Sequence, residues 1–579
     1  MHAPNAPLLP RFSDARDIDE FLEVLGRFER GELSSDAFRK FRLTRGVYGQ
    51  RQEGVQMLRV KVPQGVLFPA ALEALGAVAE DVGHGLGHVT TRQNLQFHFI
   101  PMAEMERALR ALDAAGLTTR EACGNTVRNV TACPFAGVHT AETFDVAPYG
   151  EALTRYFLRQ PWAGDLPRKF KIALSCGGSA GDCAYGAIND VGLVARVRDG
   201  ARGFQLLAAG GLSTSPQAAL ELDPFLPVER AHLACEALVR LFDRTGNREN
   251  KHRARLKYVL RRLGPEGFRR AFREEFDQAL ARSTGPLELP PERVELPPAP
   301  RSQATELRAE GYLPWRASNT FAQPQEGYAV AVLRLPLGAV TAAQLRGLAS
   351  LCQTYADGAV RTTLDQNLAL RYVPVARLPA LHRALKDLWL AQPGARTVSD
   401  VTSCPGAESC NLAVTSSRAV AAAITARLET DPALAELVAA ARATVIKLSG
   451  CPNSCGQHHI ADLGFHGAAR KVGDRTAPVY QLHLGGGVDE RGARFGRQVV
   501  KLPAKRLPEA VARLLGLYAR EREGSEAPSR FFERVAEARV LAALGDLATL
   551  DARTPDEDFL DVGEDTGFKV SIGAGECAA

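Results

Sequence analysis

Alternating hydrophobic and polar residues mark two short segments early in the chain, and a helical pattern lies between them. The segments "MLRVKV" (57–62) and "NLQFHF" (94–99) alternate residue by residue, whereas "ALEALGAVAEDV" (71–82) has apolar residues three and four positions apart. Alternation is typical of a strand with one buried face, and the wider spacing is typical of an amphipathic helix. The pattern therefore predicts a strand, a helix and a second strand.

The same order of patterns returns in the second half of the chain. "QEGVQMLRVKVPQG" (52–65) aligns with "QEGYAVAVLRLPLG" (325–338), and "TTRQNLQFHFIP" (90–101) aligns with "TLDQNLALRYVP" (363–374). Further on, "VTACP" (130–134) matches "VTSCP" (401–405), and "INDVG" (188–192) matches "IADLG" (460–464). These matches indicate a gene duplication and a pseudo-twofold protein. Longer helices follow, such as "ERAHLACEALVRLFDRTG" (229–246), so both halves are expected to be α+β or mixed α/β.

The bulk composition narrows the classes of function. The chain has 579 residues, a net charge of +5 and no basic run, which gives no reason to expect a nucleic-acid partner. The N-terminal segment lacks a secretory pattern and no run of about eighteen apolar residues occurs, so no membrane span is expected. The number and grouping of the eleven cysteines do not indicate a disulfide framework. We expect a cytoplasmic protein whose grouped thiols are metal ligands or catalytic groups.

Two pairs of cysteines lie in loops rich in Gly, Pro, Ser and Asn. "CPGAESC" contains Cys404 and Cys410, and "CPNSC" contains Cys451 and Cys455. Four thiolates suit a tetrahedral zinc ion or an iron–sulfur cluster, and these spacings are unusual for zinc. A metal site is predicted, with iron–sulfur favoured over zinc. His458 and His459 follow directly, and we expect one to be exposed and one packed, with neither a ligand.

Basic and polar residues share one face of three predicted strands. This face carries Arg59 and Lys61, then Arg92, Asn94, Gln96 and His98, then Lys169 and Lys171, and a turn-rich segment adds Arg128. In the second half the matching positions of the first two strands are Val332 and Arg334, then Asp365, Asn367, Ala369 and Arg371. For any one of these strands alone, exposure of one sheet face to solvent would explain its basic and polar residues. The difference between the halves favours a one-sided pocket for an anion.

Taken together, these motifs resemble one family. "GVYGQRQEGVQMLRVKVPQG", "VTTRQNLQFH", "GNTVRNV", "LPRKFK", "GNRENKHRARLKY", "CPGAESC" and "GCPNSC" occur in the order found in the sirohaem and [4Fe–4S] sulfite/nitrite reductases. The chain resembles this family over nearly its whole length. The resemblance implies an internally duplicated α+β protein in which paired ferredoxin-like half-domains join two larger domains that bind sirohaem and the iron–sulfur cluster.

The expected division of the chain follows from the repeats and the resemblance. It consists of an N-terminal helical extension (1–45), a first half-domain (46–115), a sirohaem- and substrate-binding domain (116–283), a Pro-rich linker (284–318), a second half-domain (319–390), a [4Fe–4S] and sirohaem domain (391–545) and an acidic C-terminal tail (546–579).

The resemblance also implies roles for individual residues. Cys404, Cys410, Cys451 and Cys455 would hold a [4Fe–4S] cluster, and Cys455 would also bridge to the sirohaem iron. Sirohaem carries eight carboxylates, and burying them requires paired cations. Arg92, Gln93, Gln96 and His98 would lie beside the macrocycle, with Arg168 and residues 253–257 as weaker candidates. Gly210, Gly211 and Gly485 to Gly487 would either let backbone approach the macrocycle or form ordinary turns.

The substrate would bind to Arg59, Arg128, Lys169 and Lys171, which suit a small oxyanion because they bind its oxygens and donate protons. Lysine at position 171 favours reduction of sulfite to sulfide, whereas the loop around Cys455 is closer to nitrite reductases, which form ammonia. Reduced ferredoxin or a separate flavoprotein would supply electrons. The alternatives are a related corrin-pathway oxygenase, a zinc-stapled binding module and an inactive sirohaem-binding structural subunit.

The remaining cysteines are given plainer interpretations. Cys133, Cys176 and Cys183 are interpreted as a lost second site, because Cys133 aligns with Cys404 but Gly137, Val138 and His139, and no cysteine, occupy the region of Cys410. Cys235 is expected in a hydrophobic core, and Cys577 is expected as an exposed thiol in the tail.

Overall fold

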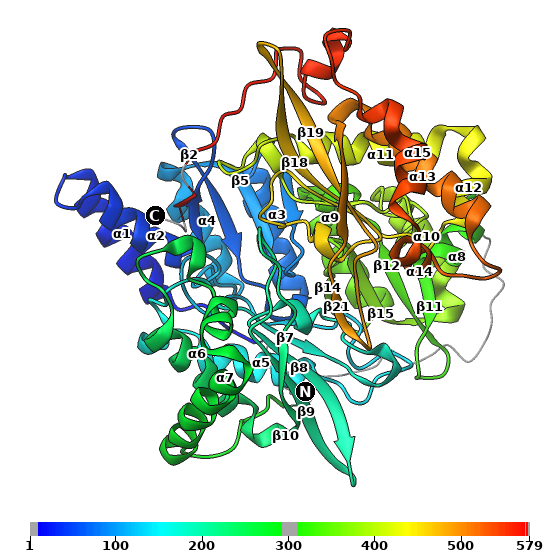
Figure 1. The fold of residues 1–579 in the computed structure, drawn as a ribbon. Coiled ribbons are helices and arrows are strands. Elements are labelled where there is room, and N and C mark those ends of the chain that lie inside the picture. Colours follow the sequence, from blue (N-terminus) through cyan, green and yellow to red (C-terminus); the bar gives the residue numbers. More distant parts are fainter. Residues whose placement is uncertain (1–9, 292–309, 574, 577–579) are drawn as a thin grey trace.

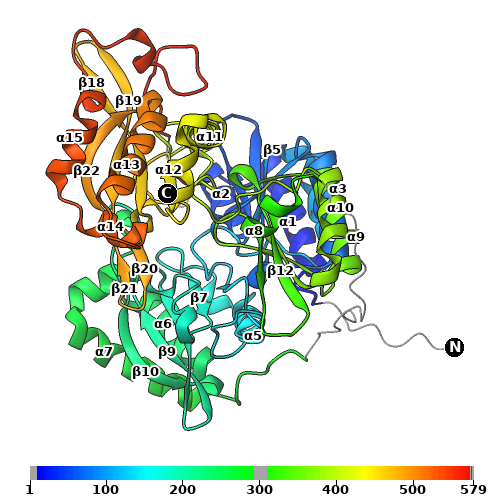
Figure 2. The ribbon, with the colours of Figure 1, turned by 90° about the vertical axis from the view of Figure 1, so that its right-hand side faces the viewer.

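The structure, a computed structural model, describes residues 10–291, 310–573 and 575–576. Each half of the chain contributes one small sheet and one large sheet, and helices cover them (Figure 1). In Figure 2 the blue and green half-domains lie together on one side, and the two larger domains lie one above the other beside them. The expected mixed α+β class and internal duplication are confirmed.

The two small sheets are built with the same strand order. The first sheet runs β1-β2-β5-β4-β13 and the second runs β11-β12-β15-β14-β3. Their strands are β1 (Val47–Gly49), β2 (Val55–Val60), β3 (Val66–Leu67), β4 (Leu86–Val89), β5 (Leu95–Pro101), β11 (Thr320–Ala322), β12 (Tyr328–Leu333), β13 (Ala339–Thr341), β14 (Val360–Thr362) and β15 (Leu368–Pro374). Each sheet therefore takes its last strand from the other half of the chain, which interlocks the halves.

Helices on the two small sheets share one hydrophobic core. The helices are α3 (Pro69–Asp81), α4 (Met105–Ala114), α9 (Ala342–Tyr355) and α10 (Leu378–Asp387), preceded by α1 (Ala15–Glu29) and α2 (Ser35–Thr44). Leu72 and Leu75 of α3 lie in the same buried cluster as Leu345 and Leu348 of α9. No helix in the described ranges is long and apolar enough to cross a membrane.

The larger domains repeat a second arrangement. One sheet contains β6 (Thr131–Ala132), β7 (Ile172–Ser175), β8 (Val191–Arg198), β9 (Ala201–Ala208) and β10 (Leu220–Pro227). The other contains β16 (Thr402–Ser403), β17 (Ile446–Ser449), β18 (Leu463–Val472), β19 (Arg475–Leu484) and β22 (Arg497–Pro503). In both sheets the first three strands are parallel and the last three antiparallel. The loops after β6 and β7, and after β16 and β17, therefore open at one edge.

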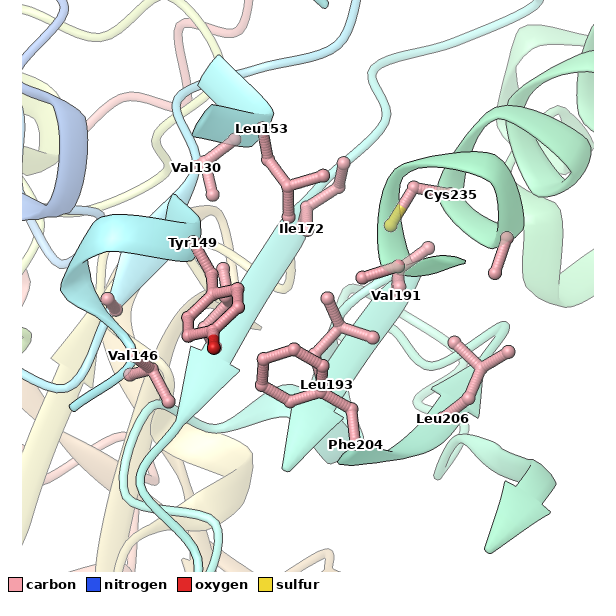
Figure 3. Close-up of a cluster of buried hydrophobic side chains, with 14 of the residues drawn as sticks. Val130, Val146, Tyr149, Leu153, Ile172, Val191, Leu193, Phe204, Leu206 and Cys235 are labelled. Atoms are coloured by element: carbon pink, nitrogen blue, oxygen red, sulfur yellow. The ribbon is translucent and has the colours of Figure 1, made fainter. Parts of the chain in front are cut away.

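Helices pack against each large sheet. They are α5 (Ala147–Phe157), α6 (Ala231–Thr245) and α7 (Leu256–Arg282) in the first domain, and α11 (Ser417–Thr430), α12 (Ala435–Ala440), α13 (Leu507–Glu521), α14 (Pro528–Arg534) and α15 (Glu537–Ala548) in the second, which also has a small hairpin of β20 (Gly487–Asp489) and β21 (Gly492–Arg494). Helix α6 ends before Gly246, as the sequence predicts. Cys235 of α6 is fully buried with Val191 and Leu206 (Figure 3), so its prediction as a core residue is confirmed.

The structure adds detail to two of the predicted segments. Part of the predicted linker is helix α8 (Tyr312–Asn319), because Tyr312 and Trp315 bury their rings against His382. The rest of the Pro-rich run, residues 292–309, lies outside the described residues. The acidic tail contacts the first half of the chain, because Glu576 pairs with Arg42 and accepts the backbone N–H of Gly49 at 2.6 Å. Cys577 lies outside the described residues.

One glutamine from each half fastens the interlocked sheets together. Gln93 donates to the carbonyls of Gln64 (3.2 Å) and Thr362 (3.0 Å) and accepts the N–H of Ala132 at 3.0 Å. Gln366, its duplicate, donates to the carbonyl of Val89 at 3.0 Å and accepts the N–H of Ser403 at 3.0 Å. Both residues have positive φ, of 62° and 67°, so these bonds offset a conformational cost.

The halves also approach too closely for any side chain at two matched glycines. A Cβ on Gly65 would lie 2.5 Å from the carbonyl oxygen of Thr362, and one on Gly338 would lie 2.6 Å from that of Val89. Both glycines have positive φ, of 77° and 70°. The closing glycines of "PQG" and "PLG" are therefore required by the contact between the halves.

Replacing Gln93 with Ala is expected to destabilise the whole protein. The change leaves the N–H of Ala132 and two carbonyls buried without partners, at a cost of about 2–4 kcal/mol. The midpoint of thermal unfolding should be several degrees lower in this variant, and Gln366→Ala should lower the midpoint in the same way. Gln353→Ala, at an exposed position of α9, is the control and should leave the midpoint unchanged. Equal midpoints for Gln93→Ala and Gln353→Ala would contradict this role.

Candidate functional site

The four cysteines of the predicted cluster meet at the open edge of the second large sheet. Cys404 follows β16 directly, and Cys451 and Cys455 follow β17, which is parallel to it. The sulfur of Cys404 accepts the N–H of Gly450 at 3.2 Å and lies 3.4 Å from the Ser417 hydroxyl. A parallel pair of strands thus brings together two cysteine motifs that are forty residues apart in the sequence.

The thiols influence one another through the protein interior. Burial, and then the charge of Cys455, raises the pKa of Cys404 to about 11. Burial also raises the pKa of Cys451, and Cys455, Cys404 and Cys410 add to the shift. Cys404 and Cys451 are buried and Cys410 is half-buried, whereas Cys455 is exposed. Binding of a cation would relieve this mutual repulsion.

Arg51 holds the cluster loop in place from the first half of the chain. Its backbone N–H donates to the carbonyl of Ser409 at 2.9 Å, and its guanidinium donates to the carbonyls of Cys410 (3.3 Å) and Ala413 (2.7 Å). The same guanidinium nitrogen donates to the carbonyl of Ser571 at 3.1 Å. Arg51 therefore joins the cluster loop to the returning C-terminal segment. Sequence reasoning missed this role because Arg51 lies in a turn, outside both predicted strands.

Two of the predicted substrate residues converge on one carbonyl. Arg59 of β2 donates to Ala122 O at 3.4 Å, and Arg128 donates to the same oxygen at 3.0 Å. Arg59 also donates to the Gln96 side chain at 2.9 Å, and Arg128 to the carbonyl of Gly124 at 2.9 Å. These contacts fix two guanidinium groups side by side.

The two predicted lysines differ from the arginines because their ammonium groups lack partners. Among the described residues, no hydrogen bond or ion pair is made by the side chain of Lys169 or Lys171. Burial, and then Arg168, lowers the pKa of Lys169 to about 8, while Cys455 raises it. Burial, and then Arg92 and Arg255, lowers the pKa of Lys171 well below its usual value. Lys169 is therefore close enough to Cys455 to feel its charge.

Arg92 lies at the centre of this basic group. It donates to the Asn189 side chain at 2.8 Å and to the carbonyl of Asn129 at 2.6 Å, and its Nε is buried without a partner in the described structure. Burial lowers its pKa to about 9, although Asp190 opposes that shift. Arg92 thus retains one buried donor for a further acceptor.

Asp190 is the carboxylate that holds this basic group together. It is fully buried and accepts from the Arg255 guanidinium at 3.2 and 2.7 Å and from the backbone N–H of Lys171 at 2.9 Å. The duplicate Asp462 accepts the N–H of Val445 at 2.8 Å in the matching place. The repeated "INDVG" and "IADLG" were a signal for this residue, since both halves need the same backbone anchor.

The other predicted cofactor residues fall into two groups. Gln96 and His98 lie on β5, next to Arg59 of the neighbouring strand β2. The Gln96 amide nitrogen lies 3.3 Å from the His98 ring, and burial lowers the pKa of His98 to about 4. Arg168 contributes to the charge around Lys169. Gln93 lies elsewhere: its amide is fully used between the halves, which leaves it no donor for a cofactor.

Several basic residues near these have structural partners. Lys61 is buried 3.6 Å from Glu121, and its duplicate Arg334 pairs with Asp400 and Glu429. Lys257 donates to the carbonyls of Leu212 and Ser215, both at 2.6 Å. The paired cation at the position of Lys61 and Arg334 is retained in both halves, whereas Arg59 and Arg92, which have Val332 and Asp365 as duplicates, are not.

Most of the glycines considered as places where the backbone approaches the macrocycle are required by close contacts within the protein. A Cβ on Gly210, Gly485 or Gly486 would lie 2.2–2.5 Å from a backbone oxygen. Gly211 instead faces the side chains of Lys257 and Arg255. Ordinary backbone packing therefore accounts for most of these glycines.

The expectation for the paired histidines is wrong in one respect. Neither His458 nor His459 is exposed, with 0% and 5% of their surfaces accessible. The ring of His458 lies tilted against those of His466 and His483 of the long β18–β19 hairpin, and the ring of His459 meets that of His483 edge-on. The hairpin is not among the predicted elements, so its position over this turn could not be expected from local patterns.

The residues that meet here fit an acidic tetrapyrrole beside a cluster. The turn before β5 contacts the cluster loop directly, because the Thr91 hydroxyl donates to the carbonyl of Cys455 at 2.9 Å. Arg92, whose Nε has no partner in the described structure, directly follows Thr91 in the chain, and the charges of Arg92 and Lys169 act on the unpaired ammonium group of Lys171. A polycarboxylate ligand requires cationic donors that have no other partners. Of the four thiols, Cys455 is the exposed one, and its charge acts on Lys169.

Comparison with known proteins identifies relatives along most of the chain. The family model described as "Nitrite and sulphite reductase 4Fe-4S domain" matches residues 123–280 and 394–545. The model described as "Nitrite/Sulfite reductase ferredoxin-like half domain" matches residues 48–115 and 321–388. These four ranges cover both small and both large sheets.

Individual relatives include both kinds of reductase. The chloroplastic ferredoxin–nitrite reductase of Zea mays is 31% identical over 525 residues, which is 88% of this chain and 84% of that protein. The sulfite reductase (ferredoxin) 1 of Mycolicibacterium paratuberculosis is 28% identical over 504 residues, 83% of this chain and 85% of that protein. The solved structure of the Mycobacterium tuberculosis NirA protein has a TM-score of 0.74 and 25% identity, covering 90% of this chain and 97% of that one.

Replacing Arg51 with Ala is expected to loosen the loop around Cys410. The variant loses charge-assisted hydrogen bonds to three carbonyls. A decrease of about 1.4 kcal/mol in the local stability of this loop would make the loop open about ten times faster. The measurement is the rate at which a chelator removes iron from anaerobically purified protein. Arg316→Ala, at an exposed position of α8, is the matched control. If both variants release iron at the wild-type rate, Arg51 does not restrain the loop.

Proposed function

Because the chain belongs to the nitrite and sulfite reductase family, an oxidoreductase family that uses sirohaem and a [4Fe–4S] cluster, we propose that it reduces sulfite to sulfide with electrons from ferredoxin. The observation that carries the proposal is the pair of ammonium groups of Lys169 and Lys171, which have no partners among the described residues and of which Lys169 feels the charge of Cys455. The relatives named as ferredoxin-dependent reductases support the electron donor.

When bound, the sirohaem and the cluster would supply the six electrons that the reduction of sulfite to sulfide requires. Cys404, Cys410, Cys451 and Cys455 are proposed to hold the cluster, and Cys455 also the sirohaem iron. The exposure of Cys455, against the burial of Cys404 and Cys451, supports this assignment. Arg92, Gln96, His98 and Arg168 are proposed to line the sirohaem. For Gln93 the occupied amide argues for a structural role.

The chain's own residues bind and protonate the oxyanion. Arg59 and Arg128 are held side by side by Ala122 O, which suits them to bind the oxygens of sulfite. Lys169 and Lys171 supply protons, since each oxygen must leave as water. Fixed cations also stabilise the negative charge that develops on the substrate during reduction.

Two features define the setting of the reaction. A net charge of +5 suits docking of a small acidic ferredoxin, although a separate flavoprotein would serve the same site. The cytoplasm is the proposed location, because thiolate ligands and a ferredoxin donor suit a reducing interior.

The substrate is tested by steady-state turnover with reduced ferredoxin, comparing kcat/KM for sulfite and for nitrite. Sulfite should be preferred, and Lys171→Asn should shift the ratio toward nitrite by about tenfold or more, since one charge-assisted contact with the third oxygen is lost. Lys471→Asn, at an exposed position on β18, should leave the ratio unchanged. A ratio equal in both variants would remove the basis for sulfite.

Nitrite is the second candidate, and the loop from Gly450 to Gly464 favours it. A wild-type preference for nitrite would establish that alternative. Iron-replete protein that turns over neither anion would instead favour an inactive sirohaem-binding subunit.

The pH dependence tests Lys169 as a proton donor. Its pKa of about 8 is lowered by burial, and a nearby carboxylate cofactor would raise it. Activity should therefore be present at low pH and fall as the pH rises through 8 or above, where the ammonium is lost. In Lys169→Arg the group stays protonated, so this fall should move to higher pH even though turnover at pH 7 drops about 10- to 100-fold. An alkaline limb at the same pH in both proteins would exclude Lys169 as the titrating group.

A further inference from the structure

Three thiols outside the proposed cluster converge in the first large domain. Cys133 follows β6, Cys176 follows β7, and Cys183 ends the loop "CGGSAGDC" (176–183). Their sulfur atoms all lie within 4.8 Å of one another. Cys133 and Cys176 are buried, and Cys183 is half-buried. Residues up to fifty positions apart thus meet at one point.

This group, the three-thiol site, is the pseudo-twofold counterpart of the cluster. Strands β6 and β7 correspond to β16 and β17, so Cys133 corresponds to Cys404. The anchors Asp190 and Asp462 bring Cys183 into register with Cys455, seven residues before each aspartate. No cysteine corresponds to Cys410, so the site offers three thiolates.

The spacing of the sulfur atoms suits a single ion. In a tetrahedral zinc site with Zn–S bonds of about 2.3 Å, two sulfur ligands lie roughly 3.8 Å apart. Among the described residues, the three-thiol site and one histidine group are the sets with three or more such ligand atoms within 4.8 Å. The four cysteines assigned to the cluster are not spaced so tightly. The two halves therefore differ in geometry as well as in the number of cysteines.

The loop that carries two of the thiols is rigidly shaped. Gly177 and Gly178 have positive φ, and a Cβ on either would lie 2.0–2.3 Å from a backbone oxygen. The N–H of Cys176 donates to the sulfur of Cys183 at 3.3 Å, which stabilises a thiolate. Asp182 accepts from the Ser175 hydroxyl at 2.6 Å and from two backbone N–H groups. The thiols are held in place by the fold without a bound ion.

A cavity beside the thiols favours a cation. Its volume is about 510 Å³, and its wall contains Cys133 and Cys183 together with one guanidinium, that of Arg396, and the four carboxylates of Asp182, Asp365, Asp489 and Glu490. Asp365 occupies the position that Arg92 has in the other half. The acidic wall would attract a metal ion and leaves room for water as a fourth ligand.

We propose that Cys133, Cys176 and Cys183 bind one Zn²⁺ as thiolates, with water from the cavity in the fourth position. Zinc binding displaces the thiol protons and involves no electron transfer. The duplicated scaffold then carries two unlike metal sites, of which one is redox-active and one is not.

The test measures metals in full-length protein produced with added zinc and purified without oxygen. Elemental analysis should find about one zinc per chain, and Cys183→Ser should lose it while keeping its iron content and visible spectrum. Cys235→Ser, which alters a fully buried thiol in the core of the same domain, should keep the zinc. X-ray absorption at the zinc edge of the unaltered protein should find sulfur ligands at about 2.3 Å, which does not depend on the folding of any variant.

Four results would overturn the assignment. They are unaltered protein without zinc, zinc retained by Cys183→Ser, a zinc shell made of nitrogen alone, or extra iron that Cys183→Ser removes. The third would assign the ion to His458, His466 and His483, and the fourth would reveal a second iron–sulfur cluster. A failure of sulfite or nitrite turnover is a separate outcome, since these readouts do not depend on activity.

Discussion

The structure depends on a concentration of positive charge that the protein alone does not neutralise. Lys169, Lys171 and Arg92 lie together as half-buried residues, and Asp190 is fully occupied with Arg255 and the backbone of Lys171. Unpaired buried cations are costly, as the lowered pKa values of both lysines show. An anionic ligand removes that cost. The need for charge compensation therefore links folding, cofactor binding and substrate binding at one place.

The interlocked halves make this arrangement possible. Strands β3 and β13 cross to the opposite sheets, and Gln93 and Gln366 fix the crossing with matched hydrogen bonds. The turn that follows β4 is thereby held against the cluster loop, where Thr91 contacts Cys455. Because the contact joins residues more than three hundred positions apart, neither half could form it alone. Both halves of the chain are thus required to form the site.

Much of the fold and of the candidate site could be predicted, because hydrophobic periodicity and internal duplication can be recognised in the amino-acid sequence itself. The alternation in β2 and β5, the helix after Leu67 and the paired cysteines all followed from local spacing. The roles of Gln93 and Lys61 did not, because each is decided by a partner from a distant segment, Thr362 and Glu121. The burial of His458 depended on a hairpin that begins five residues later. Spacing identifies which residues share a face, but it does not identify what that face contacts.

The divergence of the two halves shows how charge is assigned when a scaffold is used twice. Cations needed for folding are kept in pairs, as Lys61 with Glu121 and Arg334 with Asp400. Cations without a folding partner are kept only where an anion binds, so Arg92 has Asp365 as its counterpart. That aspartate is itself held by Lys447 at 3.0 Å, and it faces the cavity beside the three thiols. A reversal of sign at one aligned position therefore changes which class of ligand each half attracts, while the backbone anchors Asp190 and Asp462 stay the same.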